Sequence, residues 1–256
     1  MMYSEVIQWW QGKSVKDSTD LKVLLDNFRV VFACNSNKIE GNTMSYHTTR
    51  EVFENKPLTS FSGTAREIFE AQNQKFAFEF LLKSFDEHRI IDVNFILDLH
   101  KILLYGCYDE NRWSKGERPG TFKQHDYCVG VSEVGSFPDE VSSDLDDLIT
   151  QMNESASEGD VFVKAAYFHL QFESIHPFAD GNGRVGRTLL NYYLLTNGYP
   201  PIVIFDEDKE TYYLGLEVFD KTGELNNFVK FLQEQMVKTW ESKIISKELK
   251  SLSAFL

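Results

Sequence analysis

The sequence predicts a mostly α-helical fold, in a single domain, with one small β-hairpin. Three observations lead to this prediction. Apolar residues recur at helical spacing (i, i+3, i+4, i+7) along most of the 256 residues. Neither an internal repeat nor a Pro/Ser-rich linker divides the chain. Residues 120–135 (GTFKQHDYCVGVSEVG) are different, because Tyr127, Val129 and Val131 alternate with other residues at the period of a strand.

The expected helices follow one another with recognisable ends. The first spans residues 21–34, and Asp20 is its expected N-cap. Thr64 and Glu67 have the spacing of a capping box at the start of a long apolar-striped segment. Further helices are expected to begin at Asp92 and at Pro138, and to span residues 160–175, 184–197, 208–219 and 224–238.

Composition limits the classes of partner. The 39 acidic residues outnumber the 26 basic residues, for a formal net charge of −13. Such a field repels nucleic acid and anionic membranes, so any phosphate binding must be local. The chain has three cysteines without a C-x-x-C spacing, no apolar run near the roughly 20 residues of a membrane span, and no signal-like start. We therefore expect a cytoplasmic protein that binds neither nucleic acid nor membranes.

Residues 176–187, HPFADGNGRVGR, concentrate chemistry in a short loop. Pro177 disfavours a helical conformation at the preceding residue, so the helix before it should end at Ile175. Gly181 and Gly183 allow a tight turn before helical spacing resumes. A glycine-rich loop that leads into a helix N-terminus presents unpaired N–H groups and the positive end of the helix dipole. This arrangement favours a bound phosphate.

The charged residues of the loop extend this interpretation. Arg184 and Arg187 are neighbours on the first helical turn, where two cations are unfavourable unless an anion is bound. Asp180 is suited to hold a divalent cation that accompanies the anion. His176, with an unperturbed pKa of about 6.5, is suited to accept a proton at neutral pH. Together they predict a nucleotide-phosphate site with a metal ligand and a base.

Two other interpretations use the same segment. Gly181, Gly183 and Gly186 also fit the G-x-G-x-x-G fingerprint of NAD-type dinucleotide-binding proteins. That fingerprint requires a strand directly before the first glycine, whereas this segment follows a helical pattern, so we disfavour it. Alternatively, a metallohydrolase could gather His169, Glu173, His176 and Asp180 around zinc. The absence of H-E-x-x-H and the helix break at Pro177 make this a minor alternative, with His169 expected in the core.

The segment also resembles the signature of Fic-domain proteins, H-x-F-x-[D/E]-G-N-G-R-x-x-R. The resemblance takes in the helical pattern, the hairpin ahead of the motif, and NGYPP and TYY behind it, but leaves out about 1–17 and 240–256. Eight specified positions match: His176, Phe178, Asp180, Gly181, Asn182, Gly183, Arg184 and Arg187.

The resemblance implies transfer of AMP from ATP to a hydroxyl side chain of a protein. In such an enzyme His176 is the base, and Asp180 holds Mg²⁺. The hairpin is the flap that docks the target, and Phe178 anchors the loop. Tyr213 either lines the adenine pocket or packs in the core beside Tyr212. The residues that the resemblance assigns to the nucleotide phosphates are Gly181, Asn182, Gly183, Arg184 and Arg187.

A second segment, SNKIEGN (residues 36–42), resembles the inhibitory motif of the same family, [S/T]-x-x-x-E-[G/N]. Ser36 and Glu40 are one helical turn apart, and the resemblance implies that Glu40 reaches Arg187. The alternative is a solvated acid at a helix end. We therefore divide the chain into an N-terminal region with the inhibitory motif, a Fic catalytic core and a C-terminal tail, at residues 1–60, 61–240 and 241–256.

These observations favour a self-inhibited protein adenylyltransferase, with ATP as substrate and Mg²⁺ as cofactor. Its expected partner is a target protein with a Ser, Thr or Tyr hydroxyl, and we expect it to modify its own chain as well. Two other functions are left open: removal of AMP from a modified protein through Glu40, and nucleotide binding without catalysis. Homo-oligomerisation is also left open.

Overall fold

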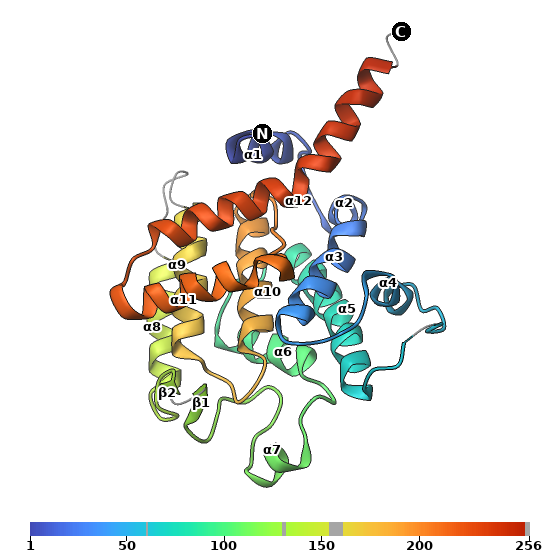
Figure 1. Ribbon diagram of the computed structural model, residues 1–256. Coiled ribbons are helices and arrows are strands. Elements are labelled where there is room, and N and C mark those ends of the chain that lie inside the picture. The colour runs from blue at the N-terminus through green and yellow to red at the C-terminus, as the bar shows by residue number, and fades with distance from the viewer. Residues whose placement is uncertain (60, 130–131, 154–160, 254–256) are drawn as a thin grey trace.

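The computed structural model describes residues 1–59, 61–129, 132–153 and 161–253, and shows a helical bundle with one two-stranded sheet (Figure 1). The mostly helical expectation is confirmed for these residues. The elements in chain order are α1 (Tyr3–Gln11), α2 (Ser18–Leu24), α3 (Asp26–Ile39), α4 (Tyr46–Phe53), α5 (Ala65–Asp86), α6 (Val93–Leu103), α7 (Glu110–Ser114), β1 (Tyr127–Val129), β2 (Ser132–Val134), α8 (Val141–Asn153), α9 (Val161–Ile175), α10 (Asn182–Thr196), the 3₁₀-helix η2 (Asp206–Asp208), α11 (Lys209–Thr222) and α12 (Asn226–Ser253).

Helix α10 is the central element of the bundle. Its residues from Arg184 to Leu195 are all buried, as expected for a helix surrounded by other elements. Leu190 and Leu194 pack in one apolar cluster with residues of α1, α3, α11 and α12, and Val185 and Leu189 pack in another with residues of α6 and α8. Because α10 is packed on all sides, its N-terminus is held in a fixed place.

The helix expected at residues 21–34 is two helices in the structure. α2 ends at Leu24 and α3 begins at Asp26, and both Leu21 and Leu25 are buried. The N-cap is Asp17 rather than Asp20, since Asp17 accepts hydrogen bonds from the backbone of residues 19 and 20. α3 continues to Ile39, five residues beyond the predicted end. The sequence concealed this extension because the added turn buries polar residues, Asn35, Ser36 and Asn37.

Several helix ends agree with the sequence. Thr64 and Glu67 form the predicted capping box of α5, and Asp92 is the N-cap of α6. Gly198 follows the end of α10 with φ +75°. By contrast, α12 runs without a break past residue 240, and its end projects from the body of the molecule (Figure 1). The division of the chain at residues 60 and 240 stays a prediction.

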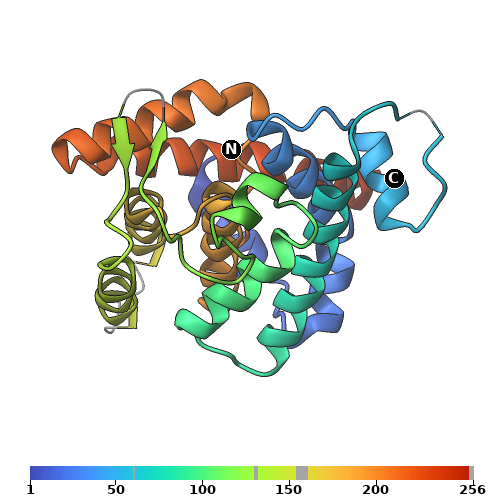
Figure 2. The ribbon, with the colours of Figure 1, turned by 90° about the horizontal axis from the view of Figure 1, so that it is seen from below.

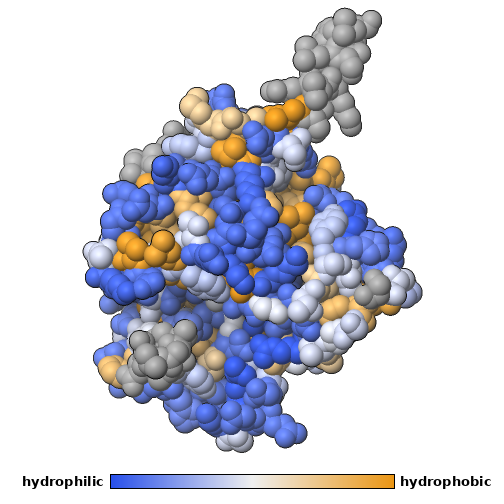
Figure 3. All heavy atoms as spheres, viewed as in Figure 1, coloured by the Kyte–Doolittle hydropathy of each residue, from blue (hydrophilic) through white to orange (hydrophobic). Residues whose placement is uncertain are grey.

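The only pairing of strands among the described residues joins β1 and β2 in antiparallel register, with Tyr127 opposite Val134 and Val129 opposite Ser132. The pair lies at the end of the bundle where α9 ends and α10 begins (Figures 1 and 2). The face shown in Figure 3 is largely hydrophilic. Within the described ranges no helix combines the length and the apolar character that crossing a membrane requires.

Candidate active site

The loop between α9 and α10 turns sharply at His176. This residue has φ +50°, in the left-handed region that residues other than glycine seldom adopt. The His176 N–H still donates to the carbonyl of Phe172, 3.1 Å away, and Pro177 follows. The Pro177 carbonyl accepts from the backbone N–H of Lys123, 2.9 Å away. The loop is therefore held at both ends of its first turn.

Phe178 and Asn182 fix the middle of the loop. The Phe178 ring is fully buried and stacks on His100, with centroids 3.6 Å apart and planes 5° apart. The side-chain oxygen of Asn182 accepts from the Phe178 N–H (2.9 Å), and its amide donates to the Phe178 carbonyl (2.8 Å). Phe178 is thus the anchor that the resemblance implied. Asn182 uses its side chain to shape the loop, so only its backbone is free to face a ligand.

His100, on α6, contacts the loop through Phe178 and the Asp180 carbonyl. It is fully buried, and burial lowers its pKa to about 3, so the ring is neutral. Its Nδ1 accepts from the Gly120 N–H (2.8 Å). Its Nε2–H can then donate to the Asp180 carbonyl (3.1 Å). Sequence analysis gave no sign that this histidine contacts the motif.

Gly181 begins α10 in a conformation that other residues avoid. Its φ is +88°, and a Cβ there would collide with Leu104. No side chain caps the first turn of α10, so the N–H groups of that turn remain available to an anion. Gly183 and Gly186 lie inside the helix, and a helix and loop, not a strand, precede Gly181. The dinucleotide-binding interpretation is therefore wrong.

His176 is partly buried, with Lys123 as the basic residue that acts on it. Burial lowers its pKa to about 4, and the charge of Lys123 acts in the same direction. The ring is therefore neutral at pH 7 and able to accept a proton. The base of the hairpin packs against it: a Cβ at Gly135 would collide with the Ile175 carbonyl and with His176, and the Ser136 N–H donates to that carbonyl (2.9 Å).

Arg184 is buried between two carboxylates. Its side chain is 2% exposed, and it donates to Glu70 Oε1 (3.0 Å) and to Asp180 Oδ1 (3.1 Å). Arg66 joins the same two acids, with distances of 2.9 Å to Glu70 and 2.7 Å to Asp180. Arg112 Nη2 is 3.6 Å from Asp180 Oδ2. Sequence analysis missed these partners, because Glu70 is 114 residues from Arg184 and no local pattern links them.

Asp180 is the loop's candidate metal ligand. Burial acts to raise its pKa, but the guanidinium groups of Arg184 and Arg66 outweigh burial and the pKa is lowered. The described residues contain no group of three or more potential ligands that could hold a metal by themselves. Mg²⁺ usually binds through one or two carboxylates together with substrate phosphates. One ionised carboxylate beside an anion site fits that pattern, whereas it does not fit the zinc site of a metallohydrolase.

Arg187 is held by the predicted inhibitory segment. Its Nε donates to Ser36 Oγ (3.0 Å), and its Nη2 donates to the Ser36 carbonyl (3.0 Å) and to Glu40 Oε1 (2.7 Å). Arg187 is 2% exposed, whereas the Glu40 side chain is 30% exposed at the end of α3. The structure thus brings Ser36, Glu40 and Arg187 together across about 150 positions of the sequence.

Tyr213 lies on α11 at the edge of the same region. Its side chain is 45% exposed, and its hydroxyl donates to the carbonyl of Ile39 over 3.4 Å. The neighbouring Tyr212 is the buried residue of the pair. The expectation that Tyr213 packs in the core is therefore wrong, and its assignment to the adenine pocket stays a prediction.

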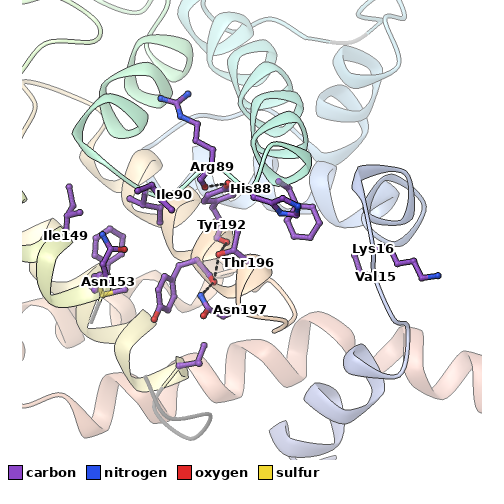
Figure 4. A pocket seen from close by; sticks show the side chains of 16 residues that line it. Val15, Lys16, His88, Arg89, Ile90, Ile149, Asn153, Tyr192, Thr196 and Asn197 are labelled. Carbon is purple, nitrogen blue, oxygen red and sulfur yellow. Dashed lines mark hydrogen bonds between the residues drawn. The ribbon is translucent and has the colours of Figure 1, made fainter. Parts of the chain in front are cut away.

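A hollow of about 660 Å³ lies elsewhere, between the end of α5, α8 and the end of α10 (Figure 4). Tyr192 at its wall donates to the Arg89 carbonyl, and Thr196 and Asn197 bond to backbone carbonyls of α10. None of residues 176–187 lines it. Because Tyr192, Thr196 and Asn197 use their polar groups within the protein and the motif lies elsewhere, the hollow is not taken as the candidate site.

Residues 90–194 match the model of the Fic/DOC family. This chain is a Fic-domain protein. It is 30% identical to the protein adenylyltransferase fic-1 of Caenorhabditis elegans, over 85% of this chain and 42% of that protein. A Fic-domain-containing signaling protein from Bacteroides thetaiotaomicron has a TM-score of 0.78 and 26% identity, covering 93% of both chains. A solved structure of C. elegans Fic-1 has a TM-score of 0.79 and 26% identity, covering 97% of this chain and 71% of that one.

The matched part of the Fic domain contains the whole motif but leaves out several residues that hold it. Ser36, Glu40 and Glu70 precede the match, and Tyr213 follows it. The chain also spans less than half the length of the curated relatives it matches. The contacts of α3 and α5 with the motif arginines therefore come from the structure of this chain rather than from the domain match.

Proposed function

We propose that this protein is an adenylyltransferase that transfers AMP from ATP to a hydroxyl side chain of a target protein. The observation that carries the proposal is a neutral His176 held beside the uncapped N-terminus of α10. Attack of a hydroxyl on a nucleotide phosphate requires a base next to a site that binds the phosphate. The names of the relatives support the same reaction.

In the proposed reaction His176 takes the proton from the acceptor hydroxyl, whose oxygen attacks the α-phosphorus. The bond from the α-phosphorus to the bridging oxygen breaks, and pyrophosphate leaves. The first-turn N–H groups of α10, from Gly181 onward, bind the phosphates, and Arg187 binds the terminal one. Asp180, braced by Arg184, would hold Mg²⁺, which neutralises phosphate charge when bound. We assign Tyr213 to the adenine pocket.

Glu40 makes the protein self-inhibited in this proposal. Its carboxylate forms an ion pair with the Arg187 guanidinium, so the terminal phosphate of ATP must displace Glu40 or bind elsewhere. Glu40 also lies against Gly183, where a Cβ would collide with it. A carboxylate at that place could instead activate water and remove AMP from a modified protein. Incubation with a pre-modified target distinguishes removal from addition.

We propose that the target protein docks on the hairpin. The base of the hairpin contacts the chain on both sides of His176. The Lys123 N–H donates to the Pro177 carbonyl, and the Ser136 N–H donates to the Ile175 carbonyl. An extended segment can pair with the edge of a two-stranded sheet. The buried, free thiols of Cys34 and Cys107 suit a reducing compartment, so we retain a cytoplasmic location as part of the proposal.

The test of the reaction is His176→Ala with labelled ATP. We expect nearly unchanged ATP binding, because other groups bind the phosphates, and a loss of AMP transfer of about 10²–10⁴-fold, the size of a general-base effect. Binding is measured by calorimetry and transfer by labelling of protein. His47→Ala, a change at an exposed histidine, is the control. Transfer retained above about a tenth of the normal rate would rule out His176 as the base.

The docking hypothesis is tested by Val129→Pro in β1, which removes a backbone N–H from the strand. We expect labelling of the target to fall while ATP binding stays unchanged. Val129→Thr keeps the N–H and serves as the matched control. If nucleotide binding and labelling fall together, the hairpin is only structural.

A further inference from the structure

Glu173 is a nearly buried acid behind the motif. It lies on α9, three residues before His176, and its side chain is 10% exposed. Its Oε1 is buried without a hydrogen-bond partner among the described residues. This oxygen rests on Gly186 of α10, where a Cβ would collide with it. The Fic motif leaves position 186 unspecified, so the glycine in this chain makes room for the Glu173 carboxyl.

Unused hydrogen-bonding atoms gather around this carboxyl. Arg187 Nη1 and His169 Nδ1 are also buried without a partner in the described part of the chain. The Nε2 of His169 lies 4.0 Å from Glu173 Oε1 and 2.9 Å from the Tyr212 hydroxyl. Buried polar atoms are nearly always bonded in folded proteins. Unbonded atoms on both Glu173 and Arg187 indicate a carboxyl and a guanidinium that can change partners.

Charges from three elements act on Glu173. Burial raises its pKa to about 8, and the charges of Glu40, at the end of α3, and Asp220, on α11, act in the same direction. Arg187 on α10 acts in the opposite direction. α11 also contributes the neutral Tyr212, whose pKa burial raises far above its usual value. No residue of α8 or α12 is among the charged groups that shift this pKa. Glu173 therefore carries a proton at neutral pH while Glu40 is docked on Arg187.

We propose that Glu173 is a positioning residue that links proton binding to the anion on Arg187. It is protonated when Glu40 or a nucleotide phosphate pairs with Arg187, and it releases the proton to water when that anion leaves. The physical reason is that a buried guanidinium needs a counter-charge. The outer acid, Glu40, provides it in the inhibited state, and the inner acid, Glu173, provides it when Arg187 would otherwise be unpaired.

The sign of the pH effect follows from this exchange. Because Glu173 takes up a proton when an anion binds Arg187, anion binding is favoured as the pH falls and weakened as the pH rises toward about 8. The part of the inference that concerns ATP rests on the proposed function. The part that concerns Glu40 does not, because both partners are in the structure.

The first experiment measures ATP affinity by calorimetry at pH 7 and pH 9. In the full-length Glu40→Gly variant we expect the affinity to fall on the order of tenfold, a typical coupling between two sites. Adding Glu173→Gln, which keeps the size of the side chain, should remove this difference. Adding Glu217→Gln instead, at an exposed acid paired with Lys221, should retain it. An equal pH dependence with and without Glu173→Gln would overturn the inference.

The second experiment needs no nucleotide. The infrared spectrum of the native chain at pH 7 should contain the band of a protonated carboxyl that Glu173→Gln removes. Glu40→Gln should remove it as well, because the neutral amide leaves Arg187 without its outer charge. A band that persists in either variant would contradict the inference. If the bands behave as expected but no AMP is transferred, the proposed function fails and the link between Glu173 and Glu40 stands.

Discussion

Arg184 and Arg187 lie one turn apart on α10, and each is 2% exposed, yet their carboxylate partners differ. Glu70, the partner of Arg184, is 7% exposed and lies inside the 22-residue helix α5. Glu40, the partner of Arg187, is 30% exposed and is the C-cap of α3, followed by Gly41 with φ +92°. A pair that is buried on both sides cannot exchange its partner without unfolding, whereas Glu40 can leave by a movement of one helix end.

The difference separates a structural arginine from a regulated one. Arg184 belongs to a network with Glu70, Asp180 and Arg66 in which acids and bases pair with each other. Arg187 has a single ion-pair partner among the described residues, Glu40, which is 30% exposed. The same residue type on the same helix therefore braces the loop at one turn and offers an exchangeable anion site at the next.

The largest expected effect comes from removing Glu70, the buried partner of Arg184. Glu70→Ala removes the bonds from Arg184, Arg66 and Asn42 and leaves both guanidinium groups with Asp180 as their one shared acid. We expect a loss of about 3–5 kcal/mol in the free energy of unfolding, measured with chemical denaturant. Glu79→Ala, at an exposed position of the same helix, is the control and should change the value by less than about 0.5 kcal/mol. Equal effects would remove the distinction between the two arginines.

Acid should lower the free energy of unfolding through buried histidines near both arginines. His100 beside Asp180 and His169 beside Tyr212 each have a pKa lowered to about 3 by burial. Since these folded-state values lie below the unfolded value of about 6.5, the unfolded chain takes up protons first. Stability is therefore constant above pH 6.5 with respect to these groups and falls below it, by up to about 1.4 kcal/mol per pH unit for each histidine.

The measurement is the free energy of unfolding from urea titrations at pH 7, 6 and 5. His100→Gln and His169→Gln should each reduce the slope below pH 6.5 by the share of one histidine. The exposed His47, changed to Gln, should leave the slope unaltered. If the slope depends on only one of the two buried histidines, the surroundings of Arg184 and Arg187 also differ in how they respond to acid.

The variant with the smallest expected effect on stability, Glu40→Gly, tests the proposed self-inhibition most directly. Glu40→Gly frees Arg187 and should raise AMP transfer, including self-modification, by at least about tenfold, because a misplacement of about 1 Å can cost on the order of 10²-fold. The loss of stability should be smaller than for Glu70→Ala, because Glu40 is 30% exposed and Glu173 can supply the counter-charge that the buried Arg187 needs. Labelling rates and denaturant midpoints measure the two effects.

Arg187→Ala should not reproduce the gain, because it also removes the partner of the terminal phosphate, and the double variant should resemble Arg187→Ala. If Glu40→Gly leaves labelling unchanged in an assay that depends on His176, Glu40 is an ordinary acid at a helix end.

Local patterns in the sequence predicted the elements and the loop. The caps at Thr64 and Asp92, the break at Pro177 and the turn at Gly181 each depend on one residue and its immediate neighbours, so they can be read directly. The end of α3 could not be read in this way. Its last turn is polar because Ser36 bonds to Arg187, while Asn35 and Asn37 bond to Asp206 and Gln74. Hydrophobic periodicity does not detect such a turn.

By itself the sequence determined that a base, an acid and two arginines share a loop before a helix. Only the tertiary structure decided which partner each of them has. Glu70 reaches Arg184 across 114 positions, and Glu40 reaches Arg187 across 147. Gly186 leaves room for Glu173, and the charge of Arg187 acts on it from the same helix. The physical reason is that backbone conformation follows from neighbouring residues, whereas the partner of a buried charge is chosen by the packing of whole helices, which leaves no local trace in the chain.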